Sequence, residues 1–131
     1  MKLVLDTNIY CDYAVGNQNV VQLLAEFGEE LYIPVVVIGE LTYGFLKGNR
    51  AIENQLKLQE IMEALHIFPL DIDQEVARKY GLIYAQLVKK GRKISINDVW
   101  IAASCLEIGG TLITRDAHFQ EIESLDVLLV T

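Results

Sequence analysis

Hydrophobic and polar residues along this chain form blocks whose lengths match those of strands and helices. Five short apolar runs predict five strands, at residues 2–5, 31–34, 67–70, 111–114 and 127–130. Between these runs, apolar residues recur at spacings of three and four, the period of an amphipathic helix. Helices are expected after Asn17, over 35–47, over about 50–65, after Asp71 or Asp73, over 96–108 and, as a short segment, near 117–123.

Residues 35–47 are ambiguous in composition, because "VVVI" is β-branched and would suit a strand. The apolar pattern nevertheless runs too long for a strand and continues through "ELTYGFLKG" to Gly48, a common helix stop. In "IFPL" (67–70), Pro69 cannot donate to a sheet ladder, so this strand is expected at an edge. Pro34 is expected in the first turn of the helix that follows it.

Strands that alternate with helices indicate βαβ units, and therefore an α/β fold with a mainly parallel, five-stranded central sheet covered on both faces. The unbroken apolar runs "LVL", "TLI" and "VLLV" favour strands that are buried on both faces. In such folds, ligands bind outside the carboxyl ends of the strands, near the point where the strand order reverses. A functional site is therefore expected at that edge of the sheet.

The length of 131 residues and the apolar content of 52% predict one domain, residues 1–131, with a substantial core. No apolar run approaches the ~20 residues that span a bilayer, and Asp6 interrupts the first run, so neither a membrane segment nor a signal peptide is expected. Cys11 and Cys105 fit reduced core thiols of a cytoplasmic protein. The net charge of −7 argues against a general nucleic-acid binder, and fits either a metal-binding acidic site or a basic partner.

Four acidic residues stand out, each with a structural alternative. Asp6 and Asp116 directly follow apolar strand segments, where each could simply cap the next helix. Asp98 lies in the first turn of the helix over 96–108, where it can stabilise the helix dipole and form a weak capping box with Ser95. Glu40 lies in the almost wholly apolar "VVVIGELTYGF". A carboxylate is costly there unless it is paired, metal-bound or on a solvent-facing stripe.

Taken together, the four acids favour a metal site over four separate caps. Asp6 and Asp116 are expected at strand ends, and Glu40 and Asp98 in the first turns of buried helices. In a doubly wound sheet these places can converge on one cleft. Carboxylates gathered there repel one another and have raised pKa values unless a cation neutralises them. Oxygen donors without a histidine or cysteine close by in the sequence suit Mg²⁺, or Mn²⁺, better than zinc.

Three segments carry a resemblance to a known family: "VLDTN" near the start, "PVVVIGELTYG" in the first third and "ISINDVWIAASCLEIGGTLITRDAHFQEI" towards the end. In that order and at those spacings, the chain resembles a PIN domain and, more narrowly, is similar to the VapC toxins of toxin–antitoxin pairs. The resemblance extends from Lys2 to about Leu128. It implies a PIN-like three-layer α/β/α sandwich.

The resemblance also implies a Mg²⁺-dependent endoribonuclease that acts as the toxin of a type II toxin–antitoxin system. Such an enzyme hydrolyses RNA phosphodiester bonds with a metal-activated water. The implied partners are an RNA substrate, a VapB-type antitoxin and a second copy of the chain in a homodimer. The residues that match the family's acidic, metal-binding quartet and its neighbouring hydroxyls are Asp6, Glu40, Asp98 and Asp116, with Thr7 and Thr114.

Other features have functional and structural interpretations that the sequence leaves open. The segment "KKGRK" (89–93) is either a solvated loop or a contact for RNA phosphate, and Arg115 is a second candidate for such a contact. His66 and His118 are interpreted as structural or surface residues. Tyr43 is interpreted as a core or interface residue rather than a base-stacking platform.

Three other functions compete with the ribonuclease. A receiver-like, Mg²⁺-binding signalling domain has a similar length and an acidic pocket. It would need a phospho-acceptor aspartate after a middle strand, for which Asp71 is a candidate, and a lysine after a late strand, but no lysine follows "TLIT" or "VLLV". A structure-specific DNA nuclease shares the chemistry but usually needs extra segments to thread a flap, for which we expect no room. A catalytically inactive PIN module that only binds RNA or protein is disfavoured by the complete set of acids.

Overall fold

Five parallel strands form the centre of the fold in the computed structural model, which describes residues 1–131. The strands are β1 (Lys2–Leu5), β2 (Glu30–Pro34), β3 (Ile67–Leu70), β4 (Thr111–Thr114) and β5 (Asp126–Leu129). They form one sheet in the order β3-β2-β1-β4-β5. The five strands expected from the sequence are confirmed to within about one residue at each end, and the strand that contains Pro69 is indeed an edge strand.

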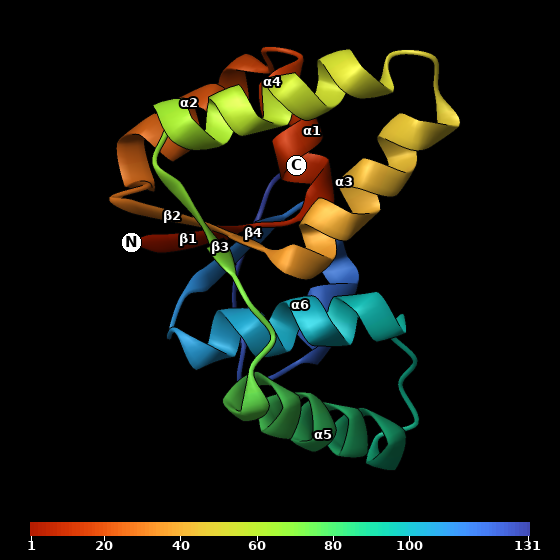
Figure 1. Cartoon of the computed structure of the whole chain (residues 1–131). Helices are drawn as coiled ribbons and strands as arrows, with labels where there is room; N and C mark the ends of the chain where they lie inside the picture. Colours follow the sequence, from red (N-terminus) through yellow and green to blue (C-terminus); the bar gives the residue numbers. More distant parts are fainter.

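Helices cover both faces of this sheet. They are α1 (Thr7–Ala14), α2 (Gln18–Phe27), α3 (Val35–Lys47), α4 (Ala51–Ala64), α5 (Gln74–Lys89), α6 (Ile96–Glu107) and the 3-10 helix η1 (Ala117–Glu121). Figure 1 shows α1, α2 and α4 on one side of the strands and α5 and α6 on the other. The α/β class and the three-layer arrangement are therefore confirmed, and none of the helices has the length and apolar character needed to cross a membrane.

The starts of several helices follow the capping rules that the sequence suggests. Asn17, Asp73 and Ser95 each accept a hydrogen bond from the backbone N–H three residues later, at 3.1, 2.9 and 3.2 Å. Pro34 differs from the expectation, because it closes β2 with an extended backbone and precedes the first turn of α3. Gly48 ends α3 as expected.

The strand order reverses between β1 and β4, which lie side by side in the middle of the sheet. Their register pairs Leu5 with Ile113, and the backbone N–H of Asp6 donates to the carbonyl of Ile113 at 3.1 Å. The carboxyl ends of the two strands are thus fixed next to each other. Residues that follow these ends share one edge of the sheet, where parallel α/β folds bind ligands.

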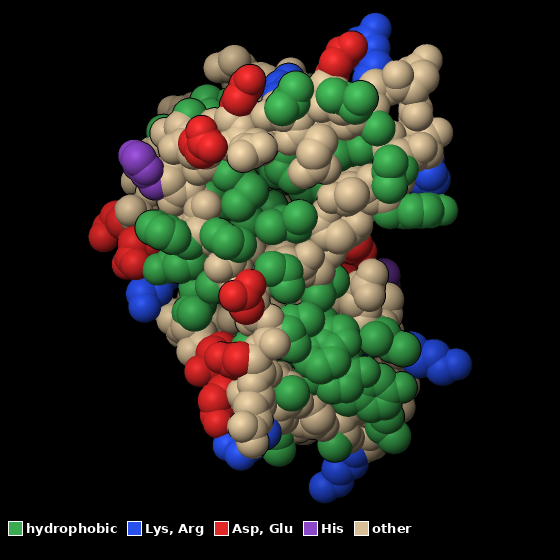
Figure 2. All heavy atoms as spheres, in the orientation of Figure 1, with side chains coloured by type: hydrophobic (Ala, Val, Ile, Leu, Met, Phe, Trp, Pro, Cys, Tyr) green, Lys and Arg blue, Asp and Glu red, His purple; other side chains and the backbone are tan.

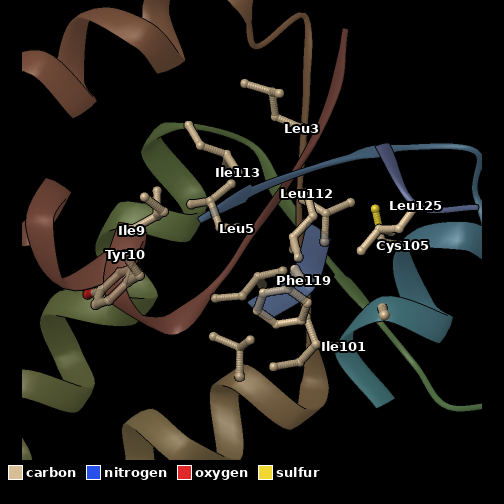
Figure 3. Close-up of a cluster of buried hydrophobic side chains, with 14 of the residues drawn as sticks. Leu3, Leu5, Ile9, Tyr10, Ile101, Cys105, Leu112, Ile113, Phe119 and Leu125 are labelled. Atoms are coloured by element: carbon tan, nitrogen blue, oxygen red, sulfur yellow. The ribbon is translucent and has the colours of Figure 1, made fainter. Parts of the chain in front are cut away.

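The two central strands are buried on both faces, as their unbroken apolar runs predict. All side chains from Leu3 to Leu5 of β1, and Leu112 and Ile113 of β4, are at most 1% exposed. Figure 3 shows these strands packed against side chains of α1 and α6 in one apolar cluster. Helix α6 is itself buried along most of its length, which fixes the position of its first turn.

Two details of the sequence analysis are wrong. Cys11 is exposed and only Cys105 is buried, because the inward face of α1 carries Ile9 and Tyr10 instead. The second wrong detail concerns β5, which was expected to be buried on both faces. It is the second edge of the sheet, and its apolar residues are only half-buried because no strand covers its outer side.

Phe119 is expected to anchor η1 to the core. Its side chain is fully buried, and Figure 3 shows it beside Leu112 and Ile101. Phe119→Ala should lower the free energy of unfolding by about 3–5 kcal/mol, because it leaves a large cavity. Phe68→Ala is the matched control, since Phe68 is 62% exposed on the edge strand and should cost less than about 0.5 kcal/mol. Urea unfolding measures both, and equal losses would show that Phe119 is not an anchor.

Candidate active site

Asp6 is a buried carboxylate at the carboxyl end of the central strand β1. It is the N-cap of α1, and its Oδ1 accepts a hydrogen bond from the Thr7 backbone N–H at 2.8 Å. Its Oδ2 accepts from the Thr114 hydroxyl at 2.6 Å and from the Asn8 side-chain amide at 3.2 Å. The residue is 5% exposed, and no lysine, arginine or histidine forms an ion pair with it. The cap interpretation is therefore correct, but it does not explain why so many donors hold this one carboxylate.

Burial raises the pKa of Asp6 above its ordinary value. Hydrogen bonds from Thr114 and from the Thr7 backbone lower it, and the negative charges of Glu40 and Asp116 raise it further. Because the net direction is upward, the donors do not fully replace the solvation that the carboxylate has lost. A cation placed beside Asp6 would remove this penalty.

Glu40 reaches the same region from the second turn of α3, one turn later than the sequence analysis placed it. Its Oε1 accepts a hydrogen bond from the Thr7 hydroxyl at 2.6 Å, and its Oε2 accepts from the Asn97 side-chain amide at 3.3 Å. Glu40 is half-buried and forms no ion pair. The solvent-stripe interpretation therefore does not hold, because the side chain joins α3 to α1 and α6.

Asp98 lies in the first turn of α6, whose N-cap is Ser95. The pKa of Asp98 is raised to about 6. Burial is the largest cause, hydrogen bonding with Ser95 acts in the opposite direction, and the negative charges of the other three acids add to the increase. Asp98 is therefore electrostatically coupled to Asp6, Glu40 and Asp116, and its structural role at the helix start does not exclude a functional one.

Asp116 follows β4 and is the N-cap of η1, as its structural interpretation predicts. Its Oδ1 accepts from the backbone N–H of His118 at 2.9 Å and lies 2.8 Å from the His118 ring nitrogen Nδ1. The backbone N–H of Asp116 donates to the Thr114 hydroxyl at 3.0 Å. Thr114 thus contacts two of the four acids, Asp6 and Asp116, and His118, interpreted from the sequence as structural or surface, contacts Asp116 as well.

The fold brings all six candidate residues to the carboxyl edge of β1 and β4. Both threonines donate to site carboxylates, and the four acids influence one another's charge. No three acidic, histidine or cysteine side chains converge closely enough to form one metal-ligand group. The four acids concentrate negative charge at this edge, where hydroxyls and amides donate hydrogen bonds to Asp6 and Glu40.

Sequence reasoning missed several residues of this network. Asn97 was given no role, yet it donates to Glu40, and Asn8 both donates to Asp6 and accepts from the Arg115 backbone N–H at 3.1 Å. Asp12 is buried and pairs with the Arg115 guanidinium, while its second oxygen has no hydrogen-bond partner. The contacts that Asn8 and Asp12 make with Arg115 join α1 to the segment after β4. The only signal in the sequence was that Asn8 and Asn97 adjoin Thr7 and Asp98.

The basic segment 89–93 is partly neutralised by acids of the chain itself. Lys90 pairs with Glu123 at 2.6 Å and Arg92 with Glu121 at 3.4 Å. The structure therefore supports the solvated-loop interpretation for these two residues. The Arg115 guanidinium is likewise paired with Asp12, through one of its nitrogens.

Comparison with known proteins extends these observations. The PIN domain family model matches residues 3–125. Ribonuclease VapC2 of Rickettsia felis is 33% identical over 131 residues, covering 95% of each chain. Ribonuclease VapC4 of Mycobacterium tuberculosis is 28% identical over 103 residues, covering 79% of each chain.

Solved structures show the same similarity. The structure of VapBC2 from Rickettsia felis bound to a DNA fragment from their promoter superposes with a TM-score of 0.82 at 30% identity, covering 98% of each chain. VapBC-1 from nontypeable Haemophilus influenzae superposes with a TM-score of 0.86 at 25% identity, also over 98% of each chain. The family match over nearly the whole length, the identity to curated relatives and the shared fold show that this chain belongs to the PIN domain family and, within it, to the VapC proteins.

Proposed function

We propose that this chain is a Mg²⁺- or Mn²⁺-dependent endoribonuclease and the toxin of a type II toxin–antitoxin pair. The observation that carries the proposal is the buried Asp6 carboxylate, surrounded by three further acids and paired with no cation. The relatives named ribonucleases support the substrate class. The receiver-like alternative finds no support, because Asp71 follows the edge strand β3 and not a central strand.

The residues that would hold the metal are Asp6, Glu40, Asp98 and Asp116. Oxygen-only donors fit Mg²⁺ and Mn²⁺, and the raised pKa values of Asp6 and Asp98 indicate uncompensated negative charge. No three of these acids form one converged ligand group, so the assignment rests on their donor chemistry and on their shared edge of the sheet. A bound divalent ion would supply charge neutralisation at the phosphate and a water made nucleophilic near neutral pH.

The chain's own contribution is orientation. The hydroxyl of Thr114 and the amide of Asn8 fix Asp6, while the hydroxyl of Thr7 and the amide of Asn97 fix Glu40. Such outer contacts orient ligating carboxylates and commonly account for 10–100-fold in affinity or activity, as an order of magnitude. Thr7 and Thr114 therefore act through the acids and need not contact the RNA.

RNA cleavage should require the metal and both Asp6 and Asp98, the two site acids whose pKa values are raised. EDTA should stop cleavage of single-stranded RNA, and Asp6→Asn and Asp98→Asn should each lower its rate more than about 100-fold, beyond the effect expected for an outer contact. Asp71→Asn is the matched control, because Asp71 is an exposed acid that also follows a strand. Cleavage by purified protein that persists undiminished in EDTA would contradict the proposal, and a wild-type protein that binds RNA without cutting it would indicate an inactive PIN module.

The metal-free protein should lose stability as the pH rises between about 4 and 6. The pKa of Asp98 is about 6 in the folded state and 3.8 ordinarily, so the folded state binds this proton more tightly. The stability it contributes is fully present below the unfolded pKa and is lost as pH rises through the folded pKa. Thermal melting in EDTA should show a fall in Tm over this window for wild type relative to Asp98→Asn. A difference between the two proteins that stays constant with pH would refute this.

We also propose that a VapB-type antitoxin inhibits the enzyme by placing a basic side chain, most simply an arginine, among the four acids. The related solved structures are VapBC complexes, and a guanidinium can bond two carboxylates at once. With a co-expressed partner, Glu40→Gln should weaken the complex about 10-fold or more, as loss of one member of a buried charge pair does. Titration calorimetry against the Asp71→Asn control measures the effect. A tight complex that still cuts RNA at full rate would place the partner elsewhere.

A further inference from the structure

We propose that the hollow beside Glu40 is a nucleotide subsite, in which an RNA base next to the cleaved phosphodiester stacks on Tyr43 and Lys47 contacts the neighbouring phosphate. This inference rests on the proposed ribonuclease function and names residues that the function does not otherwise use. The hollow has a volume of about 600 Å³, which is in the usual range for ligand pockets. It is lined by Val36, Gly39, Glu40, Tyr43, Gly44 and Lys47 of α3 and by Asn97 of α6.

The position of the hollow links it to the acids. Glu40 and Asn97, which line it, are joined by a hydrogen bond of 3.3 Å and belong to the candidate active site. Figure 2 shows the surface hollowed between the upper helices and the lower pair α5 and α6, with acidic side chains inside the hollow. A strand of RNA whose phosphate lies at the acids would therefore place an adjoining nucleotide against α3.

One face of α3 presents the groups that such a nucleotide needs. Glu40, Tyr43, Gly44 and Lys47 are spaced by three, four and seven residues, which places them on the same side of the helix. The Tyr43 side chain is 65% exposed, and it forms no hydrogen bond. Of the two sequence-based interpretations of Tyr43, core or interface residue, this exposure contradicts the core one. An exposed aromatic ring offers a stacking surface to any base.

The two glycines of α3 give independent support. Glycine in the interior of a helix costs roughly 1 kcal/mol relative to alanine. A Cβ added at Gly39 or at Gly44 would meet no atom within 4 Å, so close packing does not require glycine at either position. What the glycines do is leave bare backbone on the wall of the hollow, where a flat ligand can approach closely.

Lys47 favours an anionic ligand at the edge of the hollow. Lys47 lies over the Tyr43 ring, with its Nζ 5.1 Å from the ring centroid, and it is in no ion pair. Five of the eleven lysines and arginines are already paired with acids of this chain, namely Arg78, Lys79, Lys90, Arg92 and Arg115. In a protein of net charge −7, Lys47 is thus an available cation at the edge of the acidic region.

The test separates binding from chemistry with a short single-stranded RNA that the wild-type protein cleaves. Tyr43→Ala should raise KM about 5- to 100-fold, the loss of one base-stacking contact, with kcat within about twofold. Tyr43→Phe and Tyr43→Trp should keep KM near the wild-type value, since both side chains retain an aromatic ring although they lack the tyrosine hydroxyl. Tyr84→Ala is the control, because Tyr84 is a partly exposed tyrosine on α5, on the opposite side of the sheet.

Lys47 and the glycines provide two further variants. Lys47→Ala should reduce the salt dependence of RNA binding by about one phosphate contact, and Lys47→Arg should restore it. Lys57→Ala on α4 should leave the salt dependence unchanged. Gly39→Leu should raise KM by filling the hollow while leaving Tm unchanged or higher. Fluorescence anisotropy of a labelled RNA on the Asp98→Asn protein measures binding without turnover.

Two results would overturn the subsite. One is an unchanged KM in Tyr43→Ala while the wild type cleaves RNA normally. The other is a Tyr43→Ala protein that keeps its KM but loses affinity for the co-expressed antitoxin, which would make the hollow a protein contact. An absence of RNA cleavage by the wild-type protein would instead refute the proposed function itself, so the two failures are distinguishable.

Discussion

The burial of one carboxylate without a counterion is the constraint on which the rest of this site depends. Asp6 sits at the end of the central strand, where the sheet hides it from water and three donors from Thr7, Asn8 and Thr114 hold it. Unpaired charge in such a place is costly. The Asp6 carboxylate stays buried because β1 and β4 are packed on both faces and cannot shift to expose it. The result is a rigid anionic position at the strand-order reversal.

The sequence predicted the strands and helices around this site well, because each of them depends on a pattern within a short stretch of the chain. Strands such as 2–5 and 111–114 are unbroken apolar runs, and the helix over 35–47 was recognised by its length and its stop at Gly48. The burial of the central strands follows from the same runs. The apolar pattern says little about which face of the short helix α1 points inward. Cys11 was expected inside the protein, but it lies on the exposed face of this helix.

The contacts between distant segments could not be read from the sequence in this way. The four acids and two threonines were identified through spacing and family resemblance, and the structure gathers them at one edge. The bond from Asn97 to Glu40 and the pair of Asp12 with Arg115 join segments far apart in the chain, and no periodicity marks them. These contacts pair donors and cations with acids and amides of the chain itself. Arg115, a sequence-based candidate for a phosphate contact, is thus already paired with Asp12 through one nitrogen.

Helix α3 shows how the needs of the site override the preferences of a helix. A helix selected for stability alone would have alanine at Gly39 and Gly44 and an apolar or paired residue at Glu40. Here the helix begins directly after β2, which fixes its direction, and contacts with α1, α4 and α6 hold it in place. Because tertiary packing supplies the stability, its exposed face is free to carry an acid, a bare backbone and a tyrosine. The loss in helix propensity is confined to the face that borders the acids, which is where a substrate strand would have to lie.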